Sequence, residues 1–184
     1  AKIAGIKLCE SLNIQYDFDS ISLMPTNLYG PGDNYDPENS HVMAALIKKF
    51  CDAERYDDKY VTCWGSGNPM REFMHVEDLA DAIVFCLENW SLYDENSPKD
   101  EDGKPLSFLN IGTGKDISIH DLATEIKKIV GFEGEIIWNK NKPDGTPRKL
   151  LDVTKAKQIG WESSITLLDG IRMTYDWYVQ NKGK

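Results

Sequence analysis

The sequence predicts an α/β fold, because short apolar segments of strand length alternate with longer amphipathic segments of helix length. Loops rich in Gly, Pro, Asn and Asp follow several of the apolar segments, and open α/β sheets bind ligands in such loops, at the carboxyl ends of their strands. The chain has 184 residues, of which 41% are hydrophobic and 28% charged. This size and composition are sufficient for one domain with a proper core.

The first third of the chain begins with a predicted helix. Residues 1–13 resemble the end of a helix that packs closely against another element, because small residues separate the apolar ones. Residues 20–24 predict a buried strand, and the Gly- and Pro-rich residues 25–37 predict the loop that follows it. A helix is predicted from Ser40, since its apolar residues recur three or four positions apart, and residues 60–64 predict a second strand.

The middle of the chain predicts two strands, each followed by a helix. Residues 72–75 form an apolar strand, and residues 76–88 form an amphipathic helix with two acids in its first turn, where the helix dipole favours them. Residues 107–111 predict the next strand. The helix over 120–130 is expected to start at a capping box formed by residues 118–121.

The remaining segments are an acidic loop and the C-terminal elements. Residues 94–105 are polar and mostly acidic, which predicts a mobile surface loop. Residues 135–138 predict the last strand, and the Pro- and Gly-containing residues 143–149 predict a loop. A short helix is expected after Asp152, followed by a final helix over 167–181.

The composition argues against several classes of function. The formal net charge of −9 repels nucleic acid and an anionic membrane surface, so neither is an expected partner. No apolar run approaches the roughly 20 residues of a membrane span, and a cytoplasmic location is the simplest expectation. The four cysteines show no metal-ligand spacing, so reduced thiols and no metal are expected.

Residues 64–78 are the most informative segment. A glycine turn separates an indole, Trp64, from a guanidinium, Arg71, and an apolar strand then continues into a helix. Arginine pairs with phosphate in a bidentate way and tryptophan offers a flat face for stacking, so together they suit a nucleoside diphosphate. The alternative is that each of them serves only in packing or as surface charge.

Three other segments accompany this one: residues 25–31, 39–42 and 142–152. Together the four segments closely resemble the C-terminal portion of the GDP-L-fucose synthase branch of the extended short-chain dehydrogenase/reductase family, which acts on nucleotide sugars. The resemblance runs nearly from end to end of the chain.

Two features of such enzymes are missing, so the chain is expected to be a piece of a longer one. The glycine-rich turn that binds the cofactor pyrophosphate has no counterpart, because the G-x-G at Gly65 and Gly67 lacks a third glycine at the right spacing. The family also uses a Tyr-x-x-x-Lys pair, of which Lys2 matches the lysine, while the tyrosine would precede residue 1.

The resemblance implies an incomplete Rossmann-like, doubly wound sheet plus a small α/β substrate-binding lobe, with the N-terminal cofactor half missing. Residues 1–37 would be the C-terminal part of the NADP-binding domain. Residues 38–184 would form mainly the GDP-sugar-binding lobe, with residues 72–90 returning to the first domain; the predicted strand 107–111 is a further candidate for this return. The full-length enzyme is expected to be a homodimer, with the first helix in its contact.

The implied activity is an NADP-dependent one: 3,5-epimerisation and then 4-reduction of GDP-4-keto-6-deoxy-mannose, a GDP-sugar. An imidazole suits the role of general acid, because its pKa near 6.5 lets it exchange protons at neutral pH. The family more often has arginine at the position of Lys49. The residues that match the family's sites are His41 and Lys2 as catalytic; Lys2, Pro25, Thr26, Asn27, Leu28 and His41 as cofactor-binding; and Lys49, Trp64, Arg71 and Asp144 as substrate-binding.

Two alternatives remain open. The 184 residues by themselves are expected to be inactive, which leaves a non-catalytic nucleotide-sugar-binding or structural fragment as one alternative. The other is that the parent protein is a sibling nucleotide-sugar epimerase or dehydratase. The two parent enzymes would differ in whether they accept a GDP-sugar or a UDP-sugar.

Overall fold

The structure is a computed structural model that describes residues 1–37 and 39–183. Glu38 and Lys184, the first and last residues of the expected GDP-sugar-binding lobe, lie outside the described residues. Its class is mixed α/β with parallel strand pairs, and the predicted α/β class is confirmed. In chain order the elements are α1 (Lys2–Tyr16), β1 (Ser22–Pro25), β2 (Asn27–Tyr29), α2 (Val42–Arg55), β3 (Tyr60–Trp64), β4 (Met70–His75), α3 (Val76–Asn89), β5 (Phe108–Ile111), β6 (Asp116–Ser118), α4 (Ile119–Val130), β7 (Glu135–Asn139), β8 (Arg148–Lys149), α5 (Thr154–Gln158) and α6 (Leu167–Asn181).

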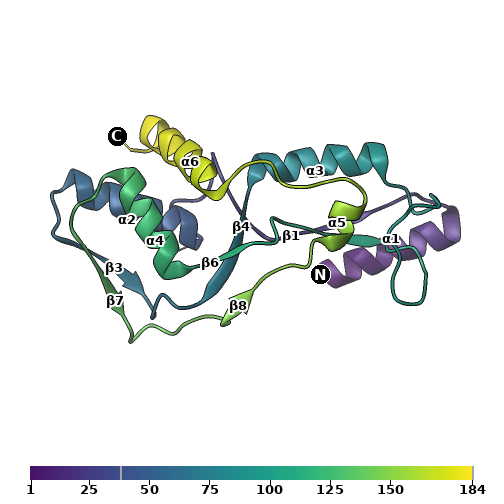
Figure 1. The fold of residues 1–184 in the computed structure, drawn as a ribbon, viewed down its shortest axis with the longest axis horizontal. Helices are drawn as coiled ribbons and strands as arrows, with labels where there is room; N and C mark the ends of the chain where they lie inside the picture. Colours follow the sequence, from purple (N-terminus) through teal and green to yellow (C-terminus); the bar gives the residue numbers. More distant parts are fainter. Residues whose placement is uncertain (38, 184) are drawn as a thin grey trace.

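The molecule is elongated, and β4 runs through its middle between two groups of elements (Figure 1). β4 pairs in parallel with β2 and β8 and antiparallel with β6. On one side of it β3 pairs in parallel with β7, and on the other side β1 pairs in parallel with β5. Parallel pairs require crossover connections, which here contain helices.

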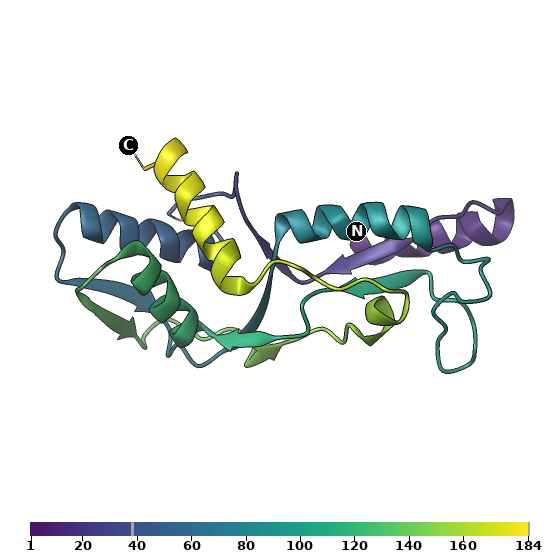
Figure 2. The ribbon, with the colours of Figure 1, turned by 45° about the horizontal axis from the view of Figure 1, so that its top comes forward.

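Each group of elements has its own apolar core. The first cluster joins α2, α4 and α6 to β3 and the facing side of β7, with Phe50 and Ile126 fully buried. The second cluster joins α3, β1, β5 and α5, with Leu109 and Ile111 buried at its centre. Figure 2 shows the two groups at opposite ends of the molecule. β4 belongs to both, because Phe73 packs in the first cluster and its neighbour Met74 in the second.

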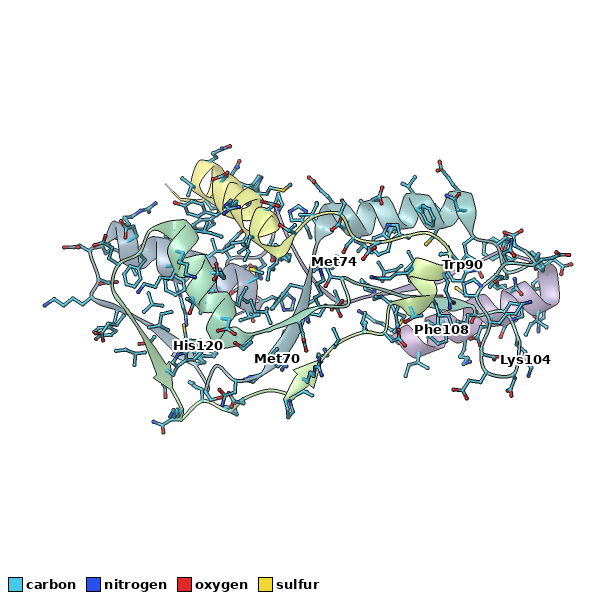
Figure 3. The ribbon with its side chains drawn as sticks, viewed as in Figure 1. Met70, Met74, Trp90, Lys104, Phe108 and His120 are labelled. Carbon is cyan, nitrogen blue, oxygen red and sulfur yellow. The ribbon has the colours of Figure 1, made fainter. Side chains whose placement is uncertain are left out.

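The labelled side chains show how β4 leads from its end near β8 toward the second cluster. In Figure 3, Met70 lies at the end of β4 near β8, and Met74 lies at the other end, near the start of α3. Trp90 follows α3 and is buried, and Phe108 begins β5. Trp161 also packs into this cluster, so the segment beyond α5 contributes to the second core as well.

Most elements agree with the prediction, and the short strands are the exceptions. β2, β6 and β8 have two or three residues each and lie in segments that were expected to be loops or, for β6, to precede a helix. Apolar periodicity does not detect strands of this length, because they are held by pairing to β4 rather than by a row of buried side chains.

One expectation about packing is wrong, and another stays a prediction. α1 is a helix, but none of its described residues is buried, and Ile3 and Ile14 are 78% and 81% exposed. Within the described residues it accepts hydrogen bonds from Ser20 and Ser107, and its expected close packing against another element stays a prediction. The acidic loop over 94–105 does not lie wholly at the surface, because Ser97 is buried and accepts a hydrogen bond from Trp90 Nε1 at 3.3 Å. None of the helices in the described residues has the length and apolar character needed to cross a bilayer.

Candidate functional site

A cavity of about 650 Å³ lies where the ends of β1 and β3 approach the start of α2, a size usual for small-molecule sites. Pro25 is the last residue of β1 and Trp64 the last of β3, so the cavity opens at the carboxyl ends of parallel strands, as in other open α/β sheets. Nine of the ten site residues expected from the sequence line this cavity: Lys2, Pro25, Thr26, Asn27, Leu28, His41, Trp64, Arg71 and Asp144.

Lys49 is the one expected site residue that does not line the cavity itself. It lies on α2, and its Nζ is 5.3 Å from the ring centroid of Trp64. The same ammonium group donates a hydrogen bond to the backbone oxygen of Thr62 at 3.0 Å. Lys49 thus lies beside the cavity, next to the indole of Trp64 at the rim of the cavity.

The segment between β1 and β2 is fixed by hydrogen bonds to neighbouring strands. The Thr26 N–H donates to the backbone oxygen of Ile111 at 3.0 Å. Thr26 Oγ1 and Asn27 Nδ2 both donate to the backbone oxygen of Glu72, at 3.3 and 2.7 Å. These side chains therefore hold the backbone in place at the floor of the cavity, and the expected cofactor segment is rigid before any ligand binds.

The start of α2 forms another wall of the cavity. His41 is the N-cap residue, in an extended conformation, and its own side chain makes no capping hydrogen bond to the first turn. The buried residues of α2 include Met43 and Ile47, so packing in the first cluster fixes where the helix begins. The free N–H groups of a first helical turn, together with the helix dipole, favour a negatively charged ligand group.

The glycine turn after β3 is held against the loop after β7. Gly65 and Gly67 have φ angles of 79° and 80°, which only glycine adopts without strain. Between them, the Ser66 N–H and Oγ donate to the two carboxylate oxygens of Asp144 at 2.8 and 2.6 Å. These hydrogen bonds from Ser66 lower the pKa of the Asp144 carboxyl. A side chain at Gly65 would collide with that carboxylate.

Arg71 lies on the same side of the cavity as this turn. Its Nη1 donates to the backbone oxygen of Met70 at 2.7 Å, which orients the guanidinium group. A Cβ atom at Gly145 would come within 2.9 Å of Arg71 Nη2, so the glycine of this loop leaves room for the guanidinium. No carboxylate forms an ion pair with Arg71 among the residues that the structure describes. The guanidinium therefore keeps donors for an anionic ligand.

Glu72 is a central residue that the sequence did not single out. It is 0% exposed, and its Oε1 accepts hydrogen bonds from the N–H groups of Thr113 and Gly114 at 2.6 and 2.8 Å. Its Oε2 accepts from the Leu151 N–H at 2.9 Å. A Cβ at Gly112 would overlap with this carboxylate, so glycine is required there. The only available signal was an acid within an apolar strand, next to Arg71.

The other two histidines do not belong to the cavity. His75 is 1% exposed, and its Nδ1 accepts a hydrogen bond from the Glu77 N–H at 3.3 Å, so it caps α3. Burial lowers the pKa of its imidazole. His120 lies at the start of α4 (Figure 3), where its Nδ1 is 3.3 Å from Asp121 Oδ1. Of the three histidines, only His41 lines the site.

Three relatives resemble the chain over nearly all of its length. The GDP-L-fucose synthase of Escherichia coli (strain K12) is 49% identical over 185 residues, which cover 100% of this chain and 56% of the relative. A crystal structure of a GDP-6-OMe-4-keto-L-xylo-heptose reductase from Campylobacter jejuni is similar with a TM-score of 0.85, at 38% identity, covering 98% of this chain and 60% of that one. A GDP-D-glycero-L-gluco-heptose synthase from the same organism, in the presence of NADPH, has a TM-score of 0.81 at 36% identity, covering 98% and 59%.

The chain spans about half the length of the curated relatives it matches. The match to a protein family is independent of these individual relatives. Residues 1–97 match the profile of the NAD dependent epimerase/dehydratase family, and this range includes α1 to α3 and most of the residues around the cavity. The chain therefore belongs to the NAD dependent epimerase/dehydratase family.

Proposed function

We propose that the chain is the C-terminal portion of an NADP-dependent GDP-L-fucose synthase. That enzyme epimerises carbons three and five of GDP-4-keto-6-deoxy-mannose and then reduces carbon four. The observation that carries the proposal is the single cavity lined by nine of the ten expected site residues, which come from segments far apart in the sequence. The 49% identity to a GDP-L-fucose synthase over the whole chain supports it.

The nucleotide end of the substrate is assigned to the side of the cavity that contains Trp64 and Arg71. The indole is largely exposed and offers a face to the guanine base, and the guanidinium binds the diphosphate through donors that no acid among the described residues occupies. Asp144 accepts hydrogen bonds from a ribose hydroxyl or the guanine amine with the lone pairs that Ser66 leaves free.

The sugar and the cofactor are assigned to the side that contains the start of α2. His41 delivers a proton to a carbon beside the keto group, after a base has removed one from the opposite face of the sugar. Lys2 and the backbone of residues 25–28 fit the nicotinamide end of NADP, because a cation and a rigid strand end lie together there. When bound, NADPH supplies the hydride for the reduction of carbon four.

The domain division and assembly extend this proposal. Residues 1–37, with 72–90 and 107–111, would belong to the cofactor domain, and the rest to the GDP-sugar lobe. The exposed apolar residues of α1 support a homodimer of the full-length enzyme, since large apolar side chains at a surface are typical of a contact. A cytoplasmic location fits an enzyme that uses NADPH. The 184 residues alone would bind the nucleotide weakly and lack catalysis.

Titration calorimetry with GDP tests the proposal. We expect the chain to bind GDP, to bind UDP more weakly, and to lose most of the GDP affinity in the variant Arg71→Ala. Arg172→Ala is the matched control, because Arg172 lies on α6 and pairs with Asp169 at 3.2 Å, away from the cavity. Equal affinities for GDP and UDP, or an equal loss in both variants, would contradict the assignment.

An assay on a protein that includes the preceding part of the enzyme tests the reaction itself. We expect NADPH oxidation with the GDP-keto sugar and none with a UDP-keto sugar. His41→Asn is expected to abolish turnover while the GDP affinity stays unchanged, because the imidazole serves in proton transfer and not in nucleotide binding. Full turnover by that variant would remove His41 from the proposed role.

A further inference from the structure

Two ammonium groups lie against the ring of Trp64 at the rim of the cavity. Lys49 Nζ is 5.3 Å and Lys142 Nζ 4.9 Å from the ring centroid. Both distances are within the range of cation–π attraction, and the indole is 60% exposed, so its ring is also accessible to a ligand. Two cations on one exposed indole are notable in a chain with a net charge of −9, because scattered surface charge would not concentrate them there.

The loop that bears Lys142 is fixed at both ends. It leaves β7 at Asn139, which is paired with Trp64 in the sheet, and the Lys142 N–H donates to the Asn139 backbone oxygen at 3.1 Å. Two residues later, Asp144 is held by both donors of Ser66. The loop backbone therefore places Lys142 beside Trp64, while its exposed side chain remains free to move.

The two lysines differ in what their ammonium groups contact. Lys49 already donates to a backbone oxygen at 3.0 Å. Lys142 forms no salt bridge or side-chain hydrogen bond within residues 1–37 and 39–183, and its ring contact uses none of its three donors in a directed bond. Lys142 is thus the cation with donors to spare, and the next residues along the chain, Pro143 and Asp144, line the cavity.

We propose that Lys142 is a second diphosphate-binding residue of the site, beside Arg71, and that the indole of Trp64 holds its ammonium in place until a ligand arrives. The proposal rests on the proposed function and deepens it. A base that stacks on Trp64 needs the ring face, so it displaces an ammonium group. The four-carbon side chain of Lys142 then lets that group move to the phosphates.

The proposal makes the site selective for the number of phosphates. Arg71 alone can pair with one phosphate group in a bidentate way. A second cation at this rim strengthens binding only when a second phosphate is present. A nucleoside diphosphate should therefore lose affinity without Lys142, a nucleoside monophosphate should lose less, and an uncharged nucleoside should lose none.

Titration calorimetry with GDP, GMP and guanosine tests this on the 184-residue chain. We expect Lys142→Gln to weaken GDP binding about tenfold, as the loss of one charge-assisted hydrogen bond does, and not to weaken guanosine binding. Lys142→Arg should restore most of the affinity. Lys140→Gln is the matched control, because Lys140 is exposed in the same loop. This substitution removes the same charge but no ammonium contact with Trp64.

Each outcome separates the two proposals. Binding of GDP by the unchanged chain with no loss in Lys142→Gln overturns the role of Lys142 and leaves the proposed function standing. An equal loss in the Lys142 and Lys140 variants also overturns it, because the effect would then be one of overall charge. If the unchanged chain does not prefer GDP to UDP, the proposed function fails and this inference fails with it.

Discussion

Replacing Glu72 by alanine tests whether one buried carboxylate holds the two halves of the molecule together. It would leave three N–H groups without their acceptor, those of the half-buried Thr113 and Leu151 and of the exposed Gly114. Each unsatisfied group costs about 1–3 kcal/mol when it is buried, and less where water reaches it. Since water reaches Gly114 and can enter the vacated space, we expect the free energy of unfolding to fall by about 2–4 kcal/mol. That is a large share of the roughly 5–15 kcal/mol that stabilises a typical domain.

Urea denaturation followed by circular dichroism measures this loss. Glu162→Ala is the control, because Glu162 is exposed and its one ion pair among the described residues is with Lys157 at 2.6 Å, and no measurable change is expected there. Glu72→Gln keeps the size of the side chain but turns an N–H donor toward a backbone donor, so an intermediate loss is expected. If Glu72→Ala is no more destabilising than Glu162→Ala, the hydrogen bonds of Glu72 do not contribute as argued.

Two further predictions concern the glycine turn and a buried histidine. Gly65→Ala and Gly131→Ala both place a side chain at a φ near +80°, but only the one at Gly65 would meet another group, the Asp144 carboxylate. Gly65→Ala should therefore lower the urea midpoint of unfolding more than Gly131→Ala does. Equal shifts would refute the contact between Gly65 and the loop after β7. Because burial lowers the pKa of His75, its protonation favours the unfolded state, whose histidine has a pKa of about 6.5. Its stabilising contribution is therefore complete above that pH and is lost as the pH falls below it. Unfolding measured from about pH 8 to about pH 5 should show a weaker pH dependence in His75→Asn than in the matched control His120→Gln; parallel curves would contradict this.

The longer elements could be predicted from the sequence because each has a buried face that sets its periodicity. α6 begins and ends at the expected residues, and the capping box of α4 forms, with the Asp121 N–H donating to Ser118 Oγ at 2.9 Å. The short strands could not be predicted, because they depend on pairing with β4. The packing of α1 stays a prediction for a related reason: apolar residues in a sequence do not say which surface covers them.

The members of the candidate site could be listed from the sequence, whereas their arrangement could not. The resemblance identified Asp144, but only the structure shows that Ser66 engages both of its oxygens. The sequence likewise gave no reason to separate Lys142 from the other lysines, since its contact with Trp64 depends on the pairing of β3 with β7. Glu72 was missed because a single acid in a strand usually faces solvent.

The division of β4 between two cores has a mechanical consequence. Phe73 and Met74 are joined by one peptide bond but are anchored in different clusters, so no flexible linker lies between those clusters along this strand. A hinge-like rotation of one core against the other would have to change the φ and ψ angles in the middle of β4 and so disrupt its pairing with β2 and β6. Entry of a ligand would then rely on movement of side chains and loops at the mouth, with the distance between the two cores unchanged.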